Sequence, residues 1–403
     1  MTDRDLEPHG SEVRPWRQRV PRGPRADRAL REVRVSLPPR IRDLDVPLDR
    51  SLAAMTTASA GDLSHLDLVH GRTLSALNHL QLRTEAVDSS KIENVDASLA
   101  DYGRALLGVG ANASATSMAS ATAALTRMIR DADERRAIRP EAILQAHHDL
   151  FRRNPDEAHR AGTFRTTQNW VGGSDYSPLG ALHVPPPPET VPDYLEDLFA
   201  FAARDDLPPV VQAAVVHAQF ESIHPFIDGN GRIGRTLIHA VLRRRRATRH
   251  LTVPIASALV AHRERYFAAL GDYRDGRART MIAMLATAVR IATAESWVTA
   301  TRLREVRDAW GATLGGSRPG TPVHRTLDLL TEEPIVNAAL VAQRIDVEEA
   351  EAAAVISRLT DAGVLRRAPR SRRAPVWLAG AVLDEVADLS DRIQVSSRRM
   401  RDA

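Results

Sequence analysis

HPFIDGNGRIGR, residues 224–235, is the most informative segment of the sequence, because it connects two helical patterns through a short glycine-rich loop. In residues 210–223, apolar side chains recur at the spacing of one buried helix face, and Pro225 is expected to end that helix. A second apolar stripe begins near Arg232. A glycine-rich loop before a helix N-terminus has free N–H groups and a dipole that favours anions. The sequence therefore predicts two consecutive helices with an anion site between them.

The polar residues of this loop are suited to phosphate chemistry. Arg232 and Arg235 are three residues apart, so they lie on one side of a helix, and guanidinium groups bind phosphate through forked hydrogen bonds. Asp228 would repel a phosphate unless a cation lay between them, which indicates magnesium. His224 is able to accept a proton near neutral pH. Each feature alone is common in structural roles, but their order predicts a site that moves a phosphate-containing group.

The whole stretch resembles the signature of Fic-domain proteins, HPFx(D/E)GNGRxxR, and matches it at every specified position. The resemblance implies a protein adenylyltransferase, which transfers AMP from ATP to a hydroxyl side chain of a target protein. It implies a role for each matched position: His224 as the base, Asp228 as the Mg²⁺ ligand, and Gly229, Asn230, Gly231, Arg232 and Arg235 as nucleotide ligands, with Arg235 on the γ-phosphate. Doc-type kinases have Lys where this chain has Gly231, which disfavours phosphoryl transfer. Some Fic relatives transfer phosphocholine, so the signature alone does not determine which nucleotide is the donor.

A second motif lies far upstream. Ser90 and Glu93 have the spacing of a capping box, which marks the start of a helix. The same segment resembles the Fic inhibitory motif, (S/T)xxxE(G/N), at Ser89, Glu93 and Asn94. The resemblance implies that Glu93 pairs with Arg235 and blocks the γ-phosphate position, so that the protein is autoinhibited. The two interpretations are compatible. In some relatives this glutamate positions a water that removes AMP from the target, so a de-AMPylating hydrolase stays open as an alternative.

Between the two motifs, the sequence predicts a hairpin. Val171 and the residues around Leu182 are expected to form two short strands, with Gly172 and Gly173 at the turn. The arrangement resembles the Fic flap, which holds an extended target segment by main-chain hydrogen bonds. Without the Fic signature, an ordinary hairpin would be the preferred interpretation. Further along, Tyr266 is expected either to line the nucleotide base or, more commonly for an aromatic residue on such a helix, to belong to the core.

Composition limits the remaining function classes. The chain has 403 residues, 43% hydrophobic residues, a formal net charge of +4 and no cysteine, which excludes disulfides and thiolate chemistry. No apolar run of membrane-spanning length and no N-terminal signal pattern is recognised, so we expect a cytoplasmic protein without a membrane span. Residues 1–40 mix arginine, proline and acidic residues with little periodicity, which indicates a partly disordered arm.

The C-terminal residues resemble a winged helix. Helices are expected over 323–331, 336–344 and 347–362, followed by a hairpin with several arginines, including Arg370, Arg372 and Arg373. Such modules often bind DNA, but the third of these helices begins with Glu348, Glu349 and Glu351, which would repel a duplex. We therefore favour docking onto the core, dimerisation or target recruitment over DNA binding, with a DNA-binding regulator as the remaining alternative.

These observations predict a mainly α-helical protein with a Fic helical core, a β-hairpin flap and a C-terminal winged helix-turn-helix domain. The expected parts are the arm (1–40), a helical region with the inhibitory motif (41–135), the catalytic core (136–300), a linker (301–320) and the winged helix (321–395). The expected ligands are ATP and Mg²⁺, and the expected partner is a target protein docked on the flap. Self-modification and a homodimer stay open.

Overall fold

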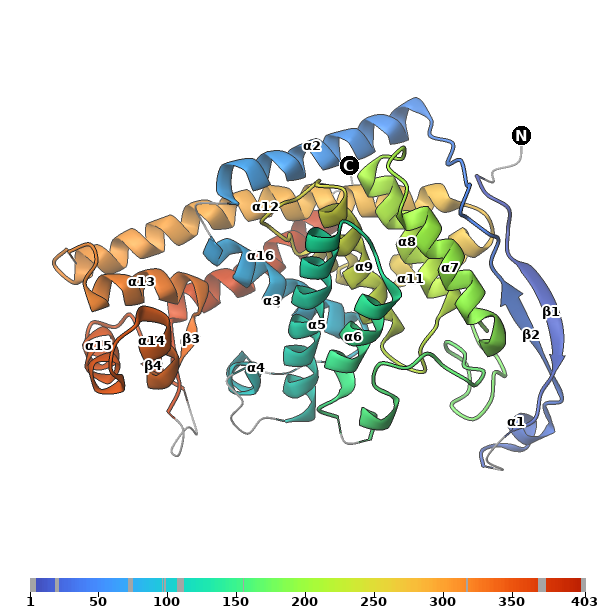
Figure 1. The fold of residues 1–403 in the computed structure, drawn as a ribbon, viewed down its shortest axis with the longest axis horizontal. Coiled ribbons are helices and arrows are strands. Elements are labelled where there is room, and N and C mark those ends of the chain that lie inside the picture. The colour runs from blue at the N-terminus through green and yellow to red at the C-terminus, as the bar shows by residue number, and fades with distance from the viewer. Residues whose placement is uncertain are drawn as a thin grey trace.

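The protein is mainly helical (Figure 1). The computed structural model describes residues 5–18, 22–71, 75–95, 97, 99–106, 112–154, 156–316, 318–368 and 375–399. Its α-helices are α1 (Arg25–Ala29), α2 (Arg50–His70), α3 (Ser75–Ile92), α4 (Leu99–Leu106), α5 (Ala113–Arg135), α6 (Pro140–Phe151), α7 (Val191–Ala202), α8 (Pro209–Ile223), α9 (Asn230–Arg244), α10 (Ile255–Val260), α11 (Arg263–Arg274), α12 (Ala278–Thr313), α13 (Pro322–Glu332), α14 (Ala338–Ile345), α15 (Glu349–Asp361) and α16 (Gly380–Arg399). Two 3₁₀ turns, η1 (Ala158–Arg160) and η2 (Pro188–Thr190), and five strands, β1 (Gly10–Pro15), β2 (Glu32–Leu37), β3 (Ile335–Val336), β4 (Arg366–Arg367) and β5 (Trp377–Leu378), complete the described elements.

The centre of the molecule is the pair α8 and α9, which pack against each other and are buried along almost their entire length. α12 and α7 cover α8, while α5 and α3 cover α9. The predicted helix over 210–223 is α8, and the loop after it leads directly into α9. Because both helices are enclosed, the 224–229 loop between them is held by buried elements at both ends.

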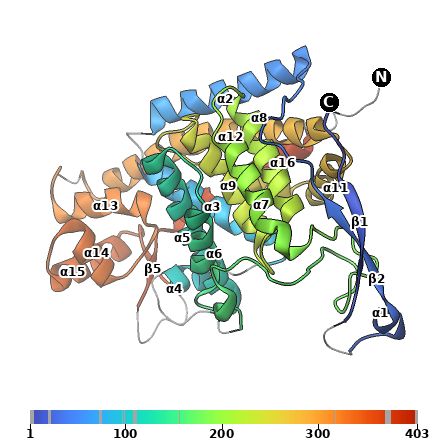
Figure 2. The same ribbon diagram turned by 45° about the vertical axis from the view of Figure 1, so that its right-hand side comes forward.

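The N-terminal arm is more ordered than the sequence analysis predicted. β1 and β2 pair as an antiparallel hairpin in which Gly10 lies opposite Leu37, and Ser36 N–H donates to the carbonyl of Val184 over 2.8 Å. The prediction of a partly disordered arm was wrong for residues 10–15 and 25–37, because the alternating Val33 and Val35 find an apolar partner far away in the sequence. This hairpin lies at the opposite end of the molecule from α13–α15 in both Figure 1 and Figure 2.

The predicted linker over 301–320 was also wrong for most of its length. α12 continues to Thr313, because Leu303 and Trp310 are buried, and the chain turns at Gly315 and Gly316. α12 is the one helix of the described residues that is long and apolar enough to cross a membrane, with a mean hydropathy of 1.3 in its most apolar window. Of that window 56% is buried, and α12 packs on α2, α8 and α16. These contacts account for its apolar residues, and the absence of a membrane span stays a prediction.

The described residues of the C-terminal module, 322–368 and 375–399, form three helices, a small sheet and a final helix. Its strands follow the order β3-β5-β4, and both pairs are antiparallel. Val336, which was predicted to begin a helix, lies in β3, where it pairs with Trp377 of β5 and its side chain is buried. The arginines Arg370, Arg372 and Arg373 lie outside the described residues. α16 packs against α12, α10 and α3, and α13 also contacts α3, so this module docks on the helix that carries the upstream motif.

Candidate active site

His224 ends α8 in a left-handed conformation, with φ of 49°, which few non-glycine residues adopt. The conformation is stabilised from outside the helix. Arg165 donates from Nε to the carbonyl of His224 over 2.9 Å and from Nη2 to the carbonyl of Ile223 over 3.3 Å. His183 Nε2 lies 2.9 Å from the carbonyl of Ser222. The otherwise unpaired carbonyls at the end of α8 are thus bonded to side chains that fix the direction of His224.

The imidazole of His224 is held by two amides. Asn169 Nδ2 and Asn230 Nδ2 donate to its Nδ1 over 3.0 and 3.1 Å. Asn230 is itself fixed, because its Oδ1 accepts from the N–H of Phe226 and its Nδ2 donates to the carbonyl of the same residue. Desolvation by the surrounding side chains, together with the positive charges of Arg165 and Arg274, lowers the pKa of His224 to about 3. The ring is therefore neutral at physiological pH and able to accept a proton.

The loop between His224 and α9 forms a cradle of main-chain N–H groups. Gly229 precedes α9 with φ of 77°, and no side chain caps the helix. A Cβ atom at Gly229 would lie 2.6 Å from a ring carbon of Phe151, so only glycine fits this approach. His147 supports the loop from below, because it stacks on Phe226 at 3.8 Å and its Nε2 lies 3.2 Å from the carbonyl of Asp228. The uncapped first turn of α9 is therefore available to an anion.

Asp228 lies at the edge of this cradle. Its Oδ1 accepts from the N–H of Gly229 over 2.6 Å and lies 3.7 Å from Arg232 Nη2, and its side chain is 59% exposed. Within the described residues, no group of three or more His, Asp or Glu side chains is placed to hold a metal ion. A magnesium ion needs only one or two protein carboxylates when phosphate oxygens and waters supply the rest. An exposed carboxylate beside an anion cradle fits that donor set.

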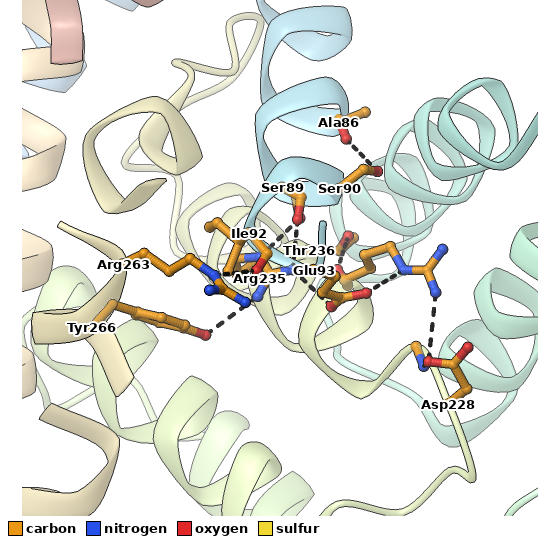
Figure 3. A network of polar contacts seen from close by, with 12 residues as sticks. Ala86, Ser89, Ser90, Ile92, Glu93, Asp228, Arg235, Thr236, Arg263 and Tyr266 are labelled. Carbon is orange, nitrogen blue, oxygen red and sulfur yellow. Dashed lines mark hydrogen bonds and ion pairs between the residues drawn. The ribbon is translucent and has the colours of Figure 1, made fainter. Parts of the chain in front are cut away.

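Glu93 bridges both arginines of the signature (Figure 3). Its Oε1 accepts from Arg235 Nη2 over 2.9 Å, and its Oε2 lies 2.7 Å from Arg232 Nε. The Arg235 side chain is only 2% exposed, whereas the Glu93 side chain is 22% exposed. Arg235 is therefore shielded from bulk water, while water still reaches Glu93. A Cβ atom at Gly231 would lie 2.3 Å from Glu93 Oε1, which means that glycine here allows the carboxylate to approach. The structure thus brings Glu93, predicted from one motif, onto Arg232 and Arg235, predicted from the other.

The upstream motif ends a helix and does not begin one, so the capping-box interpretation was wrong. Ser90 lies in the last turn of α3, where its Oγ donates to the carbonyl of Ala86 over 2.9 Å. Asn94 is left-handed, with φ of 61°, and its N–H donates to Lys91, while the N–H of Val95 donates to Ser90. This is a Schellman C-cap, which favours Gly or Asn at the left-handed position. It turns the chain so that Glu93 points at the arginines.

Ser89 contributes to the same contact. Arg235 donates from Nε to Ser89 Oγ and from Nη2 to the Ser89 carbonyl, both over 2.8 Å (Figure 3). Arg235 Nη1 also lies 3.4 Å from the hydroxyl of Tyr266, which is fully buried and therefore has the role of a core residue. The buried guanidinium is thus surrounded by partners from α3 and α11. All three predicted residues of the upstream motif, Ser89, Glu93 and Asn94, thus have a structural part in this arrangement.

Several site residues were not identified from the sequence. Arg165 and Asn169 lie 59 and 55 residues before His224, and no short-range spacing connects them to it. Ser117 on α5 accepts from Arg232 Nη1 over 3.0 Å, and Arg263 on α11 donates to the carbonyl of Ile92 over 2.7 Å. These contacts arise from packing between distant helices. For Arg165 and Asn169, the only signal in the sequence was the group of polar residues in segment 162–173, to which no role had been assigned.

In place of the two short strands that were predicted, the structure has a single antiparallel bridge between Val171 and His183. The N–H of Val171 donates to the carbonyl of His183, and the N–H of Leu182 donates back to the carbonyl of Val171, both over 2.8 Å. Gly172 and Gly173 have φ of 72° and 74°, as expected for the turn. A cavity of about 370 Å³ separates this segment from the signature loop, and its lining includes Asn169, Trp170 and Asp228. The hairpin therefore borders the open side of the site.

Comparisons with known proteins agree with this geometry. Residues 137–242 match the model of the Fic/DOC family. The chain carries a Fic/DOC domain. A probable protein adenylyltransferase of Aquifex aeolicus is 34% identical over 104 residues, which are 26% of this chain and 30% of that protein. A protein adenylyltransferase of Caenorhabditis elegans is 30% identical over 132 residues, 33% of this chain and 24% of that protein. The matches thus span less than a third of these relatives.

The fold as a whole is also similar to a solved structure. A crystal structure of a Fic family protein from Desulfovibrio desulfuricans G20 superposes with a TM-score of 0.53. The superposition covers 83% of this chain and 97% of that chain at 20% sequence identity. At this identity the likeness concerns the fold only. The chain is thus mainly helical, with a fold similar to that of this Fic family protein over more residues than the matched 137–242 segment.

Proposed function

We propose that this protein is an adenylyltransferase that moves AMP from ATP to a hydroxyl of a target protein, and that Glu93 inhibits it. The strongest support is that three independent features converge within one site. These are a neutral His224, an uncapped helix N-terminus at α9 and two arginines paired with a carboxylate in place of a phosphate. Group transfer of this kind depends mainly on positioning and on neutralising the developing charge.

Each part of the site has a role in this reaction. The N–H groups around Gly229 and Gly231 bind the phosphate that is attacked, and Arg232 and Arg235 bind the outer phosphates. Asp228 would hold Mg²⁺, which would neutralise phosphate charge. His224 takes the proton from the attacking hydroxyl, whose oxygen bonds to the α-phosphorus as the bond to the β-phosphate oxygen breaks and pyrophosphate leaves. The flap hairpin at Val171 and His183 holds the target segment over the cavity.

Isotope position in the nucleotide tests the reaction type. With ATP labelled at the α-phosphate, the Glu93→Gly variant, which lacks the inhibiting carboxylate, is expected to label itself or proteins of a lysate. ATP labelled at the γ-phosphate should leave these proteins unlabelled. Label from the γ-position would mean phosphoryl transfer and would replace this proposal by a kinase.

Inhibition follows from a competition for two guanidinium groups. Glu93 occupies Arg235 and Arg232 through separate oxygens, so a γ-phosphate has to displace a bidentate carboxylate from a largely buried site. The hydrogen bond from Arg235 is charge-assisted and therefore stronger than a neutral one, and the ion pair with Arg232 adds to it. The proposal therefore assigns the resting protein a low rate of transfer, which rises when α3 moves.

The C-terminal module is proposed to be a winged helix that holds α3 in the inhibiting position. Asp88, one residue before Ser89, is buried and accepts from Ser257 Oγ of α10 over 2.5 Å and from Ser390 Oγ of α16 over 2.7 Å. On the next face of α3, Arg83 pairs with Glu333 at the end of α13. The module thus contacts α3 close to its C-terminal end, which is followed by Glu93.

Replacing Ser390 with Ala is expected to raise the transfer rate by about three- to tenfold, because one hydrogen bond contributes about 0.5–1.5 kcal/mol and here it connects α16 to the inhibitory helix. Label transferred from α-labelled ATP measures the effect. Ser396→Ala is the matched control, because Ser396 lies on the same helix but its Oγ donates to Glu295 of α12. Equal rates for both variants would mean that α16 does not hold α3 in the inhibiting position.

DNA binding is tested by titrating a labelled duplex at low salt. The acidic residues Glu349 and Glu351 occupy the first turn of α15, where a duplex would be repelled. We therefore expect no binding. An affinity that falls steeply with added salt would favour the DNA-binding alternative.

A further inference from the structure

The positive charge of this protein is concentrated in one short segment. Residues 10–37 contain eight arginines and three acidic residues, while the whole chain has a formal net charge of only +4. The remainder of the molecule is therefore close to neutral. The segment folds as β1, α1 and β2, which form one side of the molecule next to the flap (Figure 2).

Three of these arginines surround a tryptophan. Arg17, Arg28 and Arg31 are exposed and, with Trp16 and Gln18, line a surface hollow of about 360 Å³. A main-chain hydrogen bond fixes two of the lining residues relative to each other. The N–H of Trp16 donates to the carbonyl of Arg31, which extends the β1–β2 pairing. Arg31 Nη1 donates to the carbonyls of Arg28 and Leu30 over 2.8 and 3.1 Å, which fixes its guanidinium. We name these three arginines around Trp16 the arginine platform.

The arginine platform has no carboxylate partner in the described residues. The acidic residues nearby are already engaged: Glu12 and Glu189 pair with Arg14, and the buried Asp27 accepts from Ser177 Oγ over 2.6 Å. Glu32 is exposed and adds one negative charge beside the three arginines. The surface thus keeps a local excess of positive charge, which favours an acidic partner.

The platform is joined to the active site by aromatic stacking. Trp16 meets Trp170 edge-to-face, with ring centroids 5.6 Å apart. Trp170 follows Asn169, whose amide donates to His224, and it lines the cavity beside Asp228. Trp16 and Trp170 also belong to the apolar cluster of Val33, Val35 and Val184, which connects the hairpin to the flap. A chain that lies across the cavity and continues past Trp170 therefore reaches the arginine platform.

We propose that the arginine platform binds acidic residues of the protein segment that receives AMP, and so selects targets with acidic side chains flanking the modified hydroxyl. This inference rests on the proposed transferase function. The flap tip adds exposed apolar side chains, Tyr176, Leu179 and Leu182, which suit contact with a protein surface. That combination favours a polypeptide over a nucleic acid, whose recognition relies on phosphates and stacked bases.

Peptide binding tests the platform without requiring catalysis. The probes are a fluorescent peptide with a hydroxyl residue flanked by glutamates, and a matched peptide with glutamines in their place. In fluorescence anisotropy with the full-length protein, the glutamate peptide is expected to bind about five- to tenfold more tightly, from three exposed ion pairs of modest strength. The variant Arg17→Gln/Arg28→Gln/Arg31→Gln should lose this preference.

The matched control removes the same charge elsewhere. Arg130→Gln/Arg135→Gln/Arg358→Gln changes exposed arginines of α5 and α15 and should keep the preference. Equal binding of both peptides to the unmodified protein, or equal loss in both triple variants, would overturn the proposal. Tighter binding of a single-stranded oligonucleotide than of the glutamate peptide, lost in the platform variant, would overturn it as well and assign a nucleic acid.

The experiments distinguish failure of the arginine platform from failure of the proposed transferase function. If the protein activated at Glu93 labels neither itself nor any lysate protein from α-labelled ATP, the transferase function fails while anisotropy still reports the platform. If labelling occurs but anisotropy shows no charge preference, the platform fails alone.

Discussion

Replacing Glu93 with Gly is expected to raise AMP transfer by about 10- to 100-fold, because the one charge-assisted hydrogen bond that is lost, from Arg235 Nη2 to Glu93 Oε1, contributes about 1.5–3 kcal/mol to holding Arg235 away from ATP. The substitution removes the carboxylate that bridges Arg235 and Arg232. The backbone should tolerate it, since Glu93 directly follows the last residue of α3, Ile92, so glycine does not interrupt the helix. The initial rate of label transfer from α-labelled ATP measures the change.

Asn94→Gly provides the matched control. It alters the adjacent residue of the same motif, but glycine adopts the left-handed φ of 61° that Asn94 has, and Glu93 is untouched. Its transfer rate should equal that of the wild type. A rise as large as that of Glu93→Gly would mean that the end of α3, and not the carboxylate, sets the inhibition.

The same pair of proteins distinguishes the hydrolase alternative. If Glu93 also positions water for AMP removal, the wild type releases AMP from a previously modified target and Glu93→Gly does not. Glu93 is 22% exposed, so water reaches its carboxylate. Release by neither protein would leave inhibition as the role of this residue.

The two helices and the loop between them could be predicted from the sequence because their signals are local. A proline after a helix, a glycine at the turn and two arginines three residues apart indicate where α8 ends and α9 begins, although distant residues such as Arg165 and His147 hold the loop in place. The upstream motif was also found, but its helical context was wrong. The spacing of Ser90 and Glu93 fits a helix start, whereas the left-handed Asn94 ends α3 there. α3 is enclosed on several faces, so its apolar residues give no clear period.

The remaining errors have a common physical cause, which is pairing over long sequence distances. β1 and β2 were missed because an arginine- and proline-rich composition outweighed two alternating valines, whose partner Val184 lies about 150 residues further on. Arg165 and Asn169 could not be assigned because their partner is the backbone and ring of His224. No local pattern encodes either contact.

Replacing His224 with Ala in the Glu93→Gly protein is expected to lower transfer by about 10²- to 10⁴-fold, the usual contribution of a positioned acid–base group. The amide donors of Asn169 and Asn230 mark Nδ1 as the acceptor of the neutral ring, so an incoming hydroxyl has to replace one of them there. Asn169 is the easier to displace, because Asn230 is also bonded to the N–H of Phe226. His159→Ala, at an exposed histidine of η1, serves as the control and should retain full activity.

The pH dependence of the Glu93→Gly protein tests the same residue in a second way. A base is active when deprotonated, and its activity is lost as the pH falls through its pKa, which for His224 is lowered to about 3. The transfer rate should therefore show no decline with a midpoint near 6.5, the ordinary value for histidine, between pH 8 and about pH 5. A decline centred near 6.5 that disappears in the His224→Ala protein would show that the ring is far less desolvated than its position beside Arg165 and Arg274 requires.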